Sequence, residues 1–235
     1  MSLLTIIITA SYIKSHPSID FIKKCIESLD NVCASKDTKI ILAHDFHEHE
    51  NYKNYLNNLH DYIADKPFLQ IATRDTFGCL TGNIRNAFQF VDTPYVLIVQ
   101  HDLVFIKKFD IYKIIEDMKE NNNLKHIRFN KRSNIKINSD SINELFGKQV
   151  QSTNYIYTRT PSWSDNNHLC SSDYYRNIIL NECKDGSFME KTLIRRSINE
   201  SIHNIYGTYL FGPLDETAYI IHTDGKNKSR IVGLN

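Results

Sequence analysis

One acidic residue, Asp102, interrupts an otherwise apolar run of the sequence, YVLIVQHDLVF at 95–105. An unpaired carboxylate is costly in a dry environment, so Asp102 needs a partner. Mg²⁺ or Mn²⁺ is a suitable partner, because these ions take oxygen ligands and leave several positions to waters and phosphates. A neighbouring Arg or Lys is the alternative. The run therefore predicts a metal site at which Asp102 and a divalent ion hold a diphosphate.

Polar residues also follow two other apolar runs. The run at 3–9 leads into Thr9, Ala10 and Tyr12, and the run at 39–44 leads into Asp45. The ring of Tyr12 could stack on a nucleotide base, a contact worth about 1–3 kcal/mol, and the carboxylate of Asp45 could accept the ring N–H of a pyrimidine. Each residue taken alone is also typical of an ordinary strand end. Together they predict a nucleotide site, with uridine or thymidine as the nucleoside.

These residues need a scaffold that brings several strand ends to one edge. Short β-branched runs that are apolar on both faces suit the inner strands of a parallel sheet. The segments between them carry apolar residues at helical spacing, and this alternation predicts a mostly parallel sheet with helices on both faces. Ligands bind at the carboxyl ends of such strands. The expected strands are 3–9, 39–44, 68–73 and 95–100, and the expected helices are 19–29, 52–63 and 84–91.

The alternation weakens near residue 107, which is the best soft boundary within a chain of 235 residues. This length suits one α/β domain better than two independent ones, and no Gly/Pro/Ser-rich linker divides it. Beyond the boundary, the expected helices are 110–118, 172–180 and 190–203, and the expected strands are 124–130, 151–159, 206–211 and 218–222.

Four segments of the first half together resemble the GT-A glycosyltransferases of the family-2-like kind: TIIITASY at the start, Asp45, GNIRNAF at 82–88 and QHDLVF at 100–105. The resemblance covers residues 3–106. It implies a GT-A fold and transfer of a hexose or deoxyhexose from a nucleoside-diphosphate sugar, UDP- or dTDP-linked, with 1–106 binding the donor and 107–235 the acceptor. The donor site expected from it consists of Thr9, Ala10, Tyr12, Asp45, Arg85, Gln100, His101 and Asp102, with Asn86 supporting the loop.

One position departs from the family pattern. The family usually has a DxD motif, in which the second Asp binds the metal, and Gln100 stands where the first Asp would be. A glutamine can hydrogen-bond a ribose hydroxyl but adds no negative charge, which predicts weaker metal binding. Arg85 has an alternative role as a structural salt-bridge partner.

The second half resembles a narrower group of small transferases, some of them from large DNA viruses, through PSWSDNNH at 161–168, FME at 188–190 and YIIHTDG at 219–225. This resemblance implies that Trp163 is a platform for a sugar ring of a glycan acceptor, although a lone Trp is also a common core residue. The polar residues expected to bind the acceptor beside it are Ser164, Asp165, Asn166 and His168.

An inverting transferase needs a base that takes the proton from the attacking hydroxyl. The same resemblance places Glu190 in that role, with Asp165 as the runner-up. It also implies that His222 completes the shell of a Mn²⁺ or Mg²⁺ ion bound by Asp102, and this ion would offset the charge on the leaving diphosphate. Glu190 could instead be an acid that favours a helix start, and His222 could be a core histidine.

Two other functions compete with this interpretation. HDFHEHE at 44–50 invites a zinc hydrolase that uses His44, Asp45, His47 and His49, but the spacing matches no zinc motif and favours a solvated loop. A noncatalytic nucleotide-sugar-binding module is the second competitor, because of Gln100. The absence of GxGxxG after the first strand and of a P-loop argues against a dinucleotide-dependent oxidoreductase and a nucleoside triphosphatase.

Composition limits partners and compartment. A net charge of +1 gives no basic footprint for nucleic acid. The five cysteines lack the close pairs of zinc and redox sites, which favours a reducing compartment. The apolar opening LLTIIITA is far shorter than the roughly 20 residues of a membrane span and has no basic segment before it. We therefore expect a cytoplasmic protein with no integral membrane segment.

Overall fold

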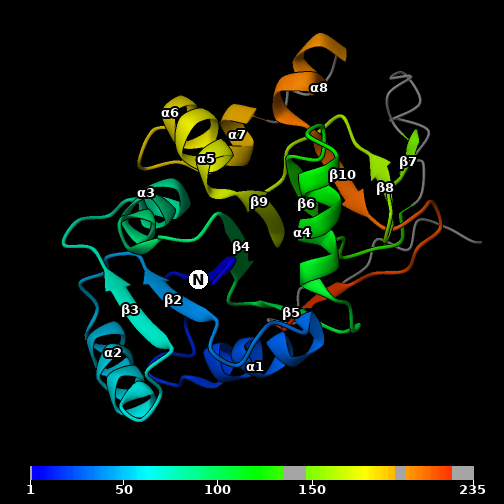
Figure 1. Ribbon diagram of the computed structural model, residues 1–235. Coiled ribbons are helices and arrows are strands. Elements are labelled where there is room, and N and C mark those ends of the chain that lie inside the picture. The colour runs from blue at the N-terminus through cyan, green and yellow to red at the C-terminus, as the bar shows by residue number, and fades with distance from the viewer. Residues whose placement is uncertain (1, 135–146, 194–199, 224–235) are drawn as a thin grey trace, which may run out of the picture.

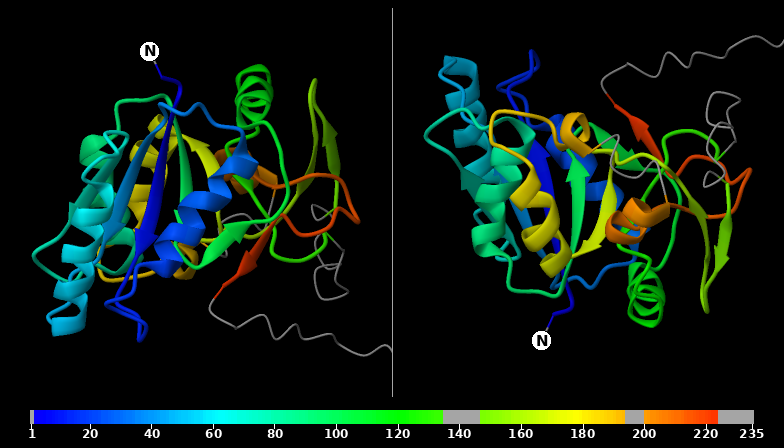
Figure 2. Two further views of the ribbon diagram at one scale, coloured as in Figure 1. Left: turned by 90° about the horizontal axis from the view of Figure 1, so that it is seen from below. Right: turned by 90° about the horizontal axis from the view of Figure 1, so that it is seen from above.

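A sheet of nine strands passes through both halves of the chain. The computed structural model describes residues 2–134, 147–193 and 200–223. The strands lie in the order β3-β2-β1-β4-β9-β6-β10-β8-β7 (Figure 1). Helices flank the strands on both sides (Figure 2). The predicted α/β architecture is confirmed.

The first four strands are those that the apolar runs predict. They are β1 (Leu4–Ala10), β2 (Lys39–His44), β3 (Leu69–Thr73) and β4 (Tyr95–Gln100), and all their pairings are parallel. Every residue of β1 is buried, because the strand is central and covered on both faces. The helices between these strands are α1 (Asp20–Ser28), α2 (Glu50–Ile63) and α3 (Cys79–Ala87), followed by short 3₁₀ turns η1 (Leu29–Val32) and η2 (Phe88–Phe90).

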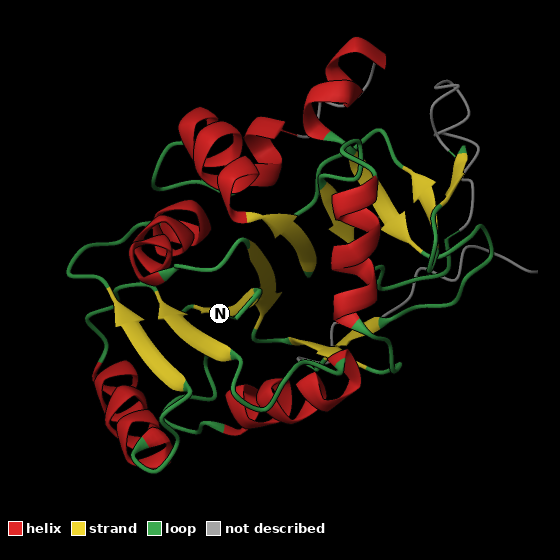
Figure 3. Ribbon diagram, in the orientation of Figure 1, coloured by secondary structure: helices red, strands yellow, loops and turns green. Residues whose placement is uncertain are grey.

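The second half adds strands of mixed direction to the same sheet. β9 (His168–Ser171) lies antiparallel between β4 and β6 (His126–Arg128), while β10 (Thr208–Phe211) runs parallel to β6. The outer strands are β8 (Ile156–Arg159) and β7 (Gln149–Gln151) (Figure 3). The single strand expected at 151–159 is wrong: a turn closed by the Ser152 N–H to the Tyr155 carbonyl oxygen splits it into a hairpin.

A separate two-stranded sheet pairs β5 (Leu103–Phe105) with β11 (Ile220–His222). The strands are antiparallel, with His222 opposite Leu103. This pairing brings a late segment of the chain next to the end of β4, and it therefore decides which residues can meet Asp102.

The remaining helices cover the second half. They are α4 (Ile111–Glu120), α5 (Ser172–Tyr174), the π-helical turn η4 (Tyr175–Ile179), α6 (Leu180–Glu182), α7 (Met189–Leu193) and α8 (Glu200–Tyr206). The helix expected at 190–203 corresponds to parts of α7 and α8, and its middle lies outside the described residues. No helix in the described ranges is both long and apolar enough to span a membrane.

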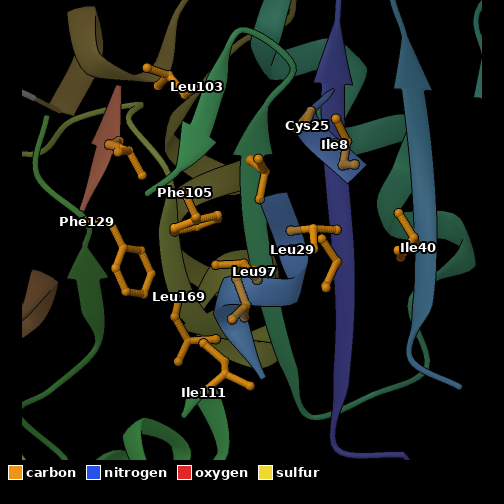
Figure 4. Close-up of a cluster of buried hydrophobic side chains, with 14 of the residues drawn as sticks. Ile8, Cys25, Leu29, Ile40, Leu97, Leu103, Phe105, Ile111, Phe129 and Leu169 are labelled. Carbon is orange, nitrogen blue, oxygen red and sulfur yellow. The ribbon is translucent and has the colours of Figure 1, made fainter. Parts of the chain in front are cut away.

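Two apolar clusters stabilise the sheet, one on each face. The larger joins α1, α2 and α4 to the strands, and Figure 4 shows part of it, including Ile8, Leu97 and Phe105. The smaller lies under α3 and η4 and includes Ile98 and Tyr175. Removing a fully buried Leu or Ile side chain from such a core typically costs about 2–5 kcal/mol, so both clusters hold the strand ends in fixed positions.

Candidate active site

Asp102 and His222 meet at the turn after β4. Nδ1 of His222 lies 3.4 Å from Oδ2 of Asp102, and the two side chains are 18% and 21% exposed. The backbone N–H of Thr223 donates to the Asp102 carbonyl oxygen at 2.9 Å, which fixes the β11 end against this turn. Within the described part of the chain, no Arg or Lys forms an ion pair with Asp102. The basic-residue alternative for Asp102 therefore has no support there.

This pair has the spacing that a divalent ion requires. A carboxylate oxygen and an imidazole nitrogen that both bind one such ion at about 2.1 Å lie about 3 Å apart, close to the separation of these two atoms. Each side chain is partly exposed, and Nδ1 of His222 itself is buried. Asp102 and His222 thus fit a Mn²⁺ or Mg²⁺ site.

Lys131 lies on the other side of His222. Its Nζ is 3.3 Å from Nε2 of the imidazole. An ammonium group can only donate, so Nε2 is the acceptor in this contact and Nδ1, which faces Asp102, carries the ring proton. Lys131 also lines a cavity of about 320 Å³ that Glu190 lines as well. The Asp102–His222 pair is therefore next to the cavity that contains the predicted base.

Glu190 and Asp165 form a pair of carboxylates. The Asp165 N–H and the Ser164 hydroxyl donate to Oε2 of Glu190 at 3.2 and 3.3 Å, and the Glu190 N–H donates to Oδ2 of Asp165 at 3.2 Å. Asp165 is 5% exposed, whereas Glu190 is half-buried and faces the cavity. The structure thus brings together the predicted base and its runner-up, with Glu190 as the accessible one.

The environment of Asp165 favours its neutral form. Burial raises the pKa of Asp165 to about 7, and the negative charge of Glu190 adds to this rise, while the hydrogen bond from the Glu190 backbone N–H opposes it. Two carboxylates that are close together cannot both ionise easily. Asp165 therefore holds a proton through most of the acidic range.

Gln100 connects the end of β4 to this pair. Its Nε2 donates to the Asp165 carbonyl oxygen at 2.6 Å, and its backbone N–H donates to Oδ1 of Asn167 at 3.0 Å. Asn167 also donates from Nδ2 to the Leu103 carbonyl oxygen at 3.0 Å and is fully buried. Asn167 was not among the predicted site residues, although it stands between two of them, because nothing in its residue type indicated that it would fix two loops.

Asp45 lies at the carboxyl end of β2, where the nucleotide site was predicted. Its Oδ1 accepts hydrogen bonds from the N–H groups of Phe46 and Gly78 at 3.0 and 2.8 Å, and its carbonyl oxygen accepts one from the Tyr52 hydroxyl. These contacts use one carboxylate oxygen to anchor the loop before α3. Oδ2 has no such role among the hydrogen bonds of the described residues.

Hydrogen bonds from side chains fix the ends of β1, β2 and β4 to one another. The Thr9 hydroxyl donates to the Val99 carbonyl oxygen, and Nδ1 of His101 lies 3.1 Å from the Thr9 carbonyl oxygen. Asn83 donates to the carbonyl oxygens of Ala10 and Ala43 at 3.2 and 2.8 Å. Asn83, which the sequence analysis missed, therefore ties the ends of β1 and β2 together from α3.

The ring of Tyr12 contacts two histidines. It stacks on His47 with 4.3 Å between ring centroids and lies 4.9 Å from His49, whereas His44 is fully buried against Tyr55. Burial, together with the nearby His101, lowers the pKa of His44 to about 3. In the described residues these histidines form no group of three metal ligands. The arrangement gives no support to the zinc hydrolase alternative.

Arg85 is engaged in structural contacts. Its Nε donates to Asp185 at 2.9 Å, and its NH2 group donates to the carbonyl oxygens of Leu180 and Cys183 at 2.8 and 2.6 Å. Arg74 binds the same Asp185 carboxylate at 3.1 Å. These are the contacts expected of the salt-bridge alternative, and the predicted nucleoside-binding role of Arg85 has no support from them.

Two predicted acceptor residues lie in the core instead. Trp163 is one of the residues that line the cavity, but it is fully buried and its ring centroid lies 4.0 Å from that of His126. His168 is also fully buried, with its ring nitrogens next to the Asn166 carbonyl oxygen and the Tyr175 hydroxyl. Ser164 and Asn166 line the cavity, as expected of acceptor residues. The core alternative for Trp163 therefore fits the structure better.

No protein-family model matches the sequence, and a search of curated proteins finds no relative. Solved structures do match. Residues 1–349 of S. aureus TarS in complex with UDP-GlcNAc superpose with a TM-score of 0.55 at 14% identity, over 93% of this chain and 57% of the 1–349 chain. The mannosyltransferase PcManGT from Pyrobaculum calidifontis, in complex with GDP-Man and Mn²⁺, has a TM-score of 0.55 at 10% identity, over 91% and 55%. GalNAc-T7 with UDP, GalNAc and Mn²⁺ has a TM-score of 0.55 at 10% identity, over 94% and 44%.

The chain has the GT-A glycosyltransferase fold. At 10–14% identity these likenesses establish the GT-A fold alone. The chain also spans less than two thirds of the length of the TarS, PcManGT and GalNAc-T7 structures. The narrower resemblance to transferases of large DNA viruses stays a prediction.

Proposed function

We propose that this GT-A chain transfers a sugar from a nucleoside-diphosphate sugar to a hydroxyl group of a glycan acceptor, with inversion at the anomeric carbon. One observation carries the proposal: Lys131, which contacts His222 of the Asp102–His222 pair, lines the same cavity as Glu190 of the Glu190–Asp165 pair. A transferase needs a cation site for the leaving diphosphate and a base for the attacking hydroxyl, and these two pairs supply the residue types for both.

The donor side rests on Asp102 and His222. These residues would hold a Mn²⁺ or Mg²⁺ ion, which when bound offsets the negative charge that builds on the leaving diphosphate. Complexes of PcManGT and GalNAc-T7 contain Mn²⁺, which agrees with this assignment. Since Gln100 is committed to the Asp165 backbone and is neutral, Asp102 is the only acid at this ion site among the described residues.

The acceptor side rests on Glu190. Its carboxylate takes the proton of the acceptor hydroxyl while that oxygen attacks the anomeric carbon from the face opposite the diphosphate. The Ser164 hydroxyl and the Asp165 N–H fix Oε2 for this task. Asp165 carries a proton over much of the acidic range, so over that range it adds no second negative charge beside Glu190.

The nucleoside is proposed to be uridine or thymidine. Asp45 retains one carboxylate oxygen for a ring N–H, and the ring of Tyr12 lies at the same edge of the sheet. TarS has been solved with UDP-GlcNAc and GalNAc-T7 with UDP, in line with this choice. Action in the cytoplasm is proposed from the five free cysteines, which persist as thiols in a reducing compartment.

Donor binding tests the proposal directly. The melting temperature of the purified chain is measured with UDP, with Mn²⁺ and with both, because a ligand that binds only the folded state raises stability. UDP with Mn²⁺ should stabilise wild type more than the sum of the two alone. Asp102→Asn should lose this synergy, while Asp61→Asn, an exposed acid on α2, should keep it. Equal responses of wild type and Asp102→Asn would overturn the metal assignment.

A screen of nucleotide sugars then tests the reaction. Release of the nucleoside diphosphate is followed with and without Mn²⁺ and with glycan acceptors. A noncatalytic binding module, which the neutral Gln100 keeps as the second candidate, would bind UDP but release no product with any donor. Ion-dependent release that rises with acceptor supports transfer.

A further inference from the structure

Three potential metal ligands meet inside the core, away from the cavity described above. His126 on β6 pairs directly with Cys170 on β9, and His168 lies two residues before Cys170 on the same strand. Alternate residues of a strand share a face, and a direct cross-strand partner lies on that face too. The register of the two strands therefore places all three side chains together, and each of them is fully buried.

The ligating atoms of His126, His168 and Cys170 are close enough for one ion. They lie within 4.8 Å of one another. Any triangle with sides of that length or less has a point no more than about 2.8 Å from its three corners, whereas Zn–N and Zn–S bonds need about 2.0–2.3 Å. Shifts of about 0.5–0.8 Å, which small side-chain rotations provide, would complete such bonds.

The hydrogen bonds around His168 prepare one ring nitrogen for a metal. Nδ1 lies 2.7 Å from the Asn166 carbonyl oxygen, so it carries the proton and Nε2 keeps its lone pair. A metal-binding histidine commonly donates its other N–H to a backbone carbonyl in this manner. Only the Tyr175 hydroxyl, at 3.3 Å, contacts Nε2 among the hydrogen bonds of the described residues.

The ring nitrogens of His126 are a separate observation that points to a bound ion. Both its ring nitrogens are buried, and neither has a well-formed hydrogen bond in the described part of the chain. Buried polar side chains nearly always have a partner, and a bound ion is one partner that such a side chain can have.

We propose that His126, His168 and Cys170 bind one thiolate-preferring ion, Zn²⁺ or Cu⁺. Imidazole and thiolate suit these ions, whereas Mg²⁺ and Mn²⁺ prefer oxygen. Binding releases the Cys170 thiol proton to solvent, and the thiolate sulfur then forms the bond to the ion. One thiolate and two neutral imidazoles make a neutral site with Cu⁺ and a site of charge +1 with Zn²⁺. The positive charge of Arg128 nearby favours the neutral one.

The ion would have a structural role that supports the active site. β6 leads into the segment that carries Lys131, and β9 follows the segment that carries Asp165 and Asn167. An ion bound between β6 and β9 therefore fixes these two segments, both of which contribute residues to the cavity lining, relative to each other. This inference does not depend on the proposed transferase activity, because UDP and Mn²⁺ bind at other residues.

Metal content of the untagged protein provides the test. The chain is produced in medium supplemented with zinc or with copper, freed of loose metal with a chelator, and analysed by mass spectrometry. We expect about one tightly held ion per chain, with its identity deciding between Zn²⁺ and Cu⁺. Cys170→Ala and His126→Asn should lose it, while Asp102→Asn and Cys183→Ala should retain it. Cys183 is the matched control, since it is a buried thiol in the same apolar cluster. Wild type with less than about a tenth of an ion per chain overturns the proposal.

A measurement on wild type guards against variants that fail to fold. Apo protein is titrated with Co²⁺ without oxygen, and with Cu⁺ against a coloured Cu⁺ chelator, while circular dichroism confirms the fold. A thiolate-to-cobalt charge-transfer band, or removal of Cu⁺ from the chelator, is the expected result. The absence of both signals in folded wild type, under conditions where UDP and Mn²⁺ still bind, overturns this inference and leaves the proposed function intact.

Discussion

The two halves of the sheet are held in place by different forces. β1 to β4 are neighbouring parallel strands, with β3 at the edge of the sheet, and their apolar side chains enter the two core clusters. The second half depends more on single polar side chains that bind backbone groups across loops. Asp117 of α4, fully buried, accepts hydrogen bonds from the N–H groups of Asn154 and Tyr155 and from the Tyr157 hydroxyl. Asn134 donates to the carbonyl oxygens of Phe211 and Pro213.

This difference explains where the chemistry lies. The parallel half presents fixed strand ends, and the polar contacts of the second half bring Glu190 and His222 to those ends. If this description is right, replacing a single polar residue of the second half should lower transfer or stability although little apolar surface is lost. Four predictions examine that comparison.

Replacement of the base should have the largest effect. Glu190→Gln keeps the size of the side chain but cannot take a proton, and loss of a positioned general base typically lowers the rate by about 10²–10⁴-fold. The transfer rate should fall by that amount, while the gain in melting temperature from UDP and Mn²⁺ stays unchanged. Glu27→Gln, an exposed acid on α1 that does not line the cavity, is the control. Full transfer activity in Glu190→Gln would remove Glu190 from the mechanism.

The buried acid of the pair should give a pH-dependent stability. The pKa of Asp165 is raised in the folded state from its ordinary value of 3.8 to about 7. The folded chain therefore binds this proton more tightly, and the stabilisation from it is full below about pH 4 and is lost as pH rises to about 7. The whole change is at most about 4 kcal/mol.

Asp165→Asn isolates this effect from other groups that titrate in the same range. Burial lowers the pKa of His16 to about 4, and that shift acts in the opposite direction, since protons then bind the unfolded chain more tightly between about pH 4 and 6.5. The difference in unfolding free energy, wild type minus Asp165→Asn, should fall between pH 4 and 7 in urea titrations. A difference that is constant with pH contradicts the raised pKa.

A polar contact in the second half should be as important to stability as an apolar side chain in the first. Asp117→Ala leaves the donors from Asn154, Tyr155 and Tyr157 without their acceptor, which we expect to cost about 3 kcal/mol. Glu116→Ala, the exposed neighbour on the same helix, should change stability by less than about 0.5 kcal/mol. Urea unfolding of both variants gives the comparison, and equal stabilities would show that the second half does not depend on this contact.

The same contrast decides how much the sequence could predict. β1, β2, β3 and β4 were predictable because apolar runs carry their period in neighbouring residues. Asp117, Asn83 and Asn167 could not be assigned, because a buried Asp or Asn has the same letter as an exposed one and its partners lie far along the chain. The turn at Ser152–Tyr155 was missed because the N–H groups of Asn154 and Tyr155 bind Asp117, a partner that lies far along the chain.

The predicted site also contains residues that the sequence could identify and residues that it could not. Asp102 stood out because it interrupts an apolar run, and the structure places it beside His222 as the family resemblance implied. Glu190 and Asp165 also came from the resemblance, and they pair. For Trp163 the sequence left both a sugar platform and a core position open, because an aromatic ring next to polar residues looks alike in sequence in either place. Its full burial shows only in three dimensions.

The smallest predicted effect concerns Lys131 and the order of events at His222. Lys131 donates to Nε2, so Nε2 must keep its lone pair and Nδ1 must carry the proton. An ion bound to Nδ1 requires the opposite tautomer, with the proton on Nε2. Binding of the ion and the Lys131 contact therefore exclude each other. Lys131→Met should raise the affinity for Mn²⁺ alone roughly twofold to fivefold, the equivalent of about 0.5–1 kcal/mol for an exposed charged contact.

Calorimetric titration of Mn²⁺ without donor measures this affinity apart from catalysis. Arg132→Gln is the matched control, because Arg132 lines the same cavity and its removal changes the charge equally, whereas the contact with His222 comes from Lys131. An equal gain in both variants would mean that general charge, and not the tautomer of His222, sets the affinity. A gain confined to Lys131→Met would instead show that this second-half residue competes with the ion and is released when the ion binds, free to contact the diphosphate.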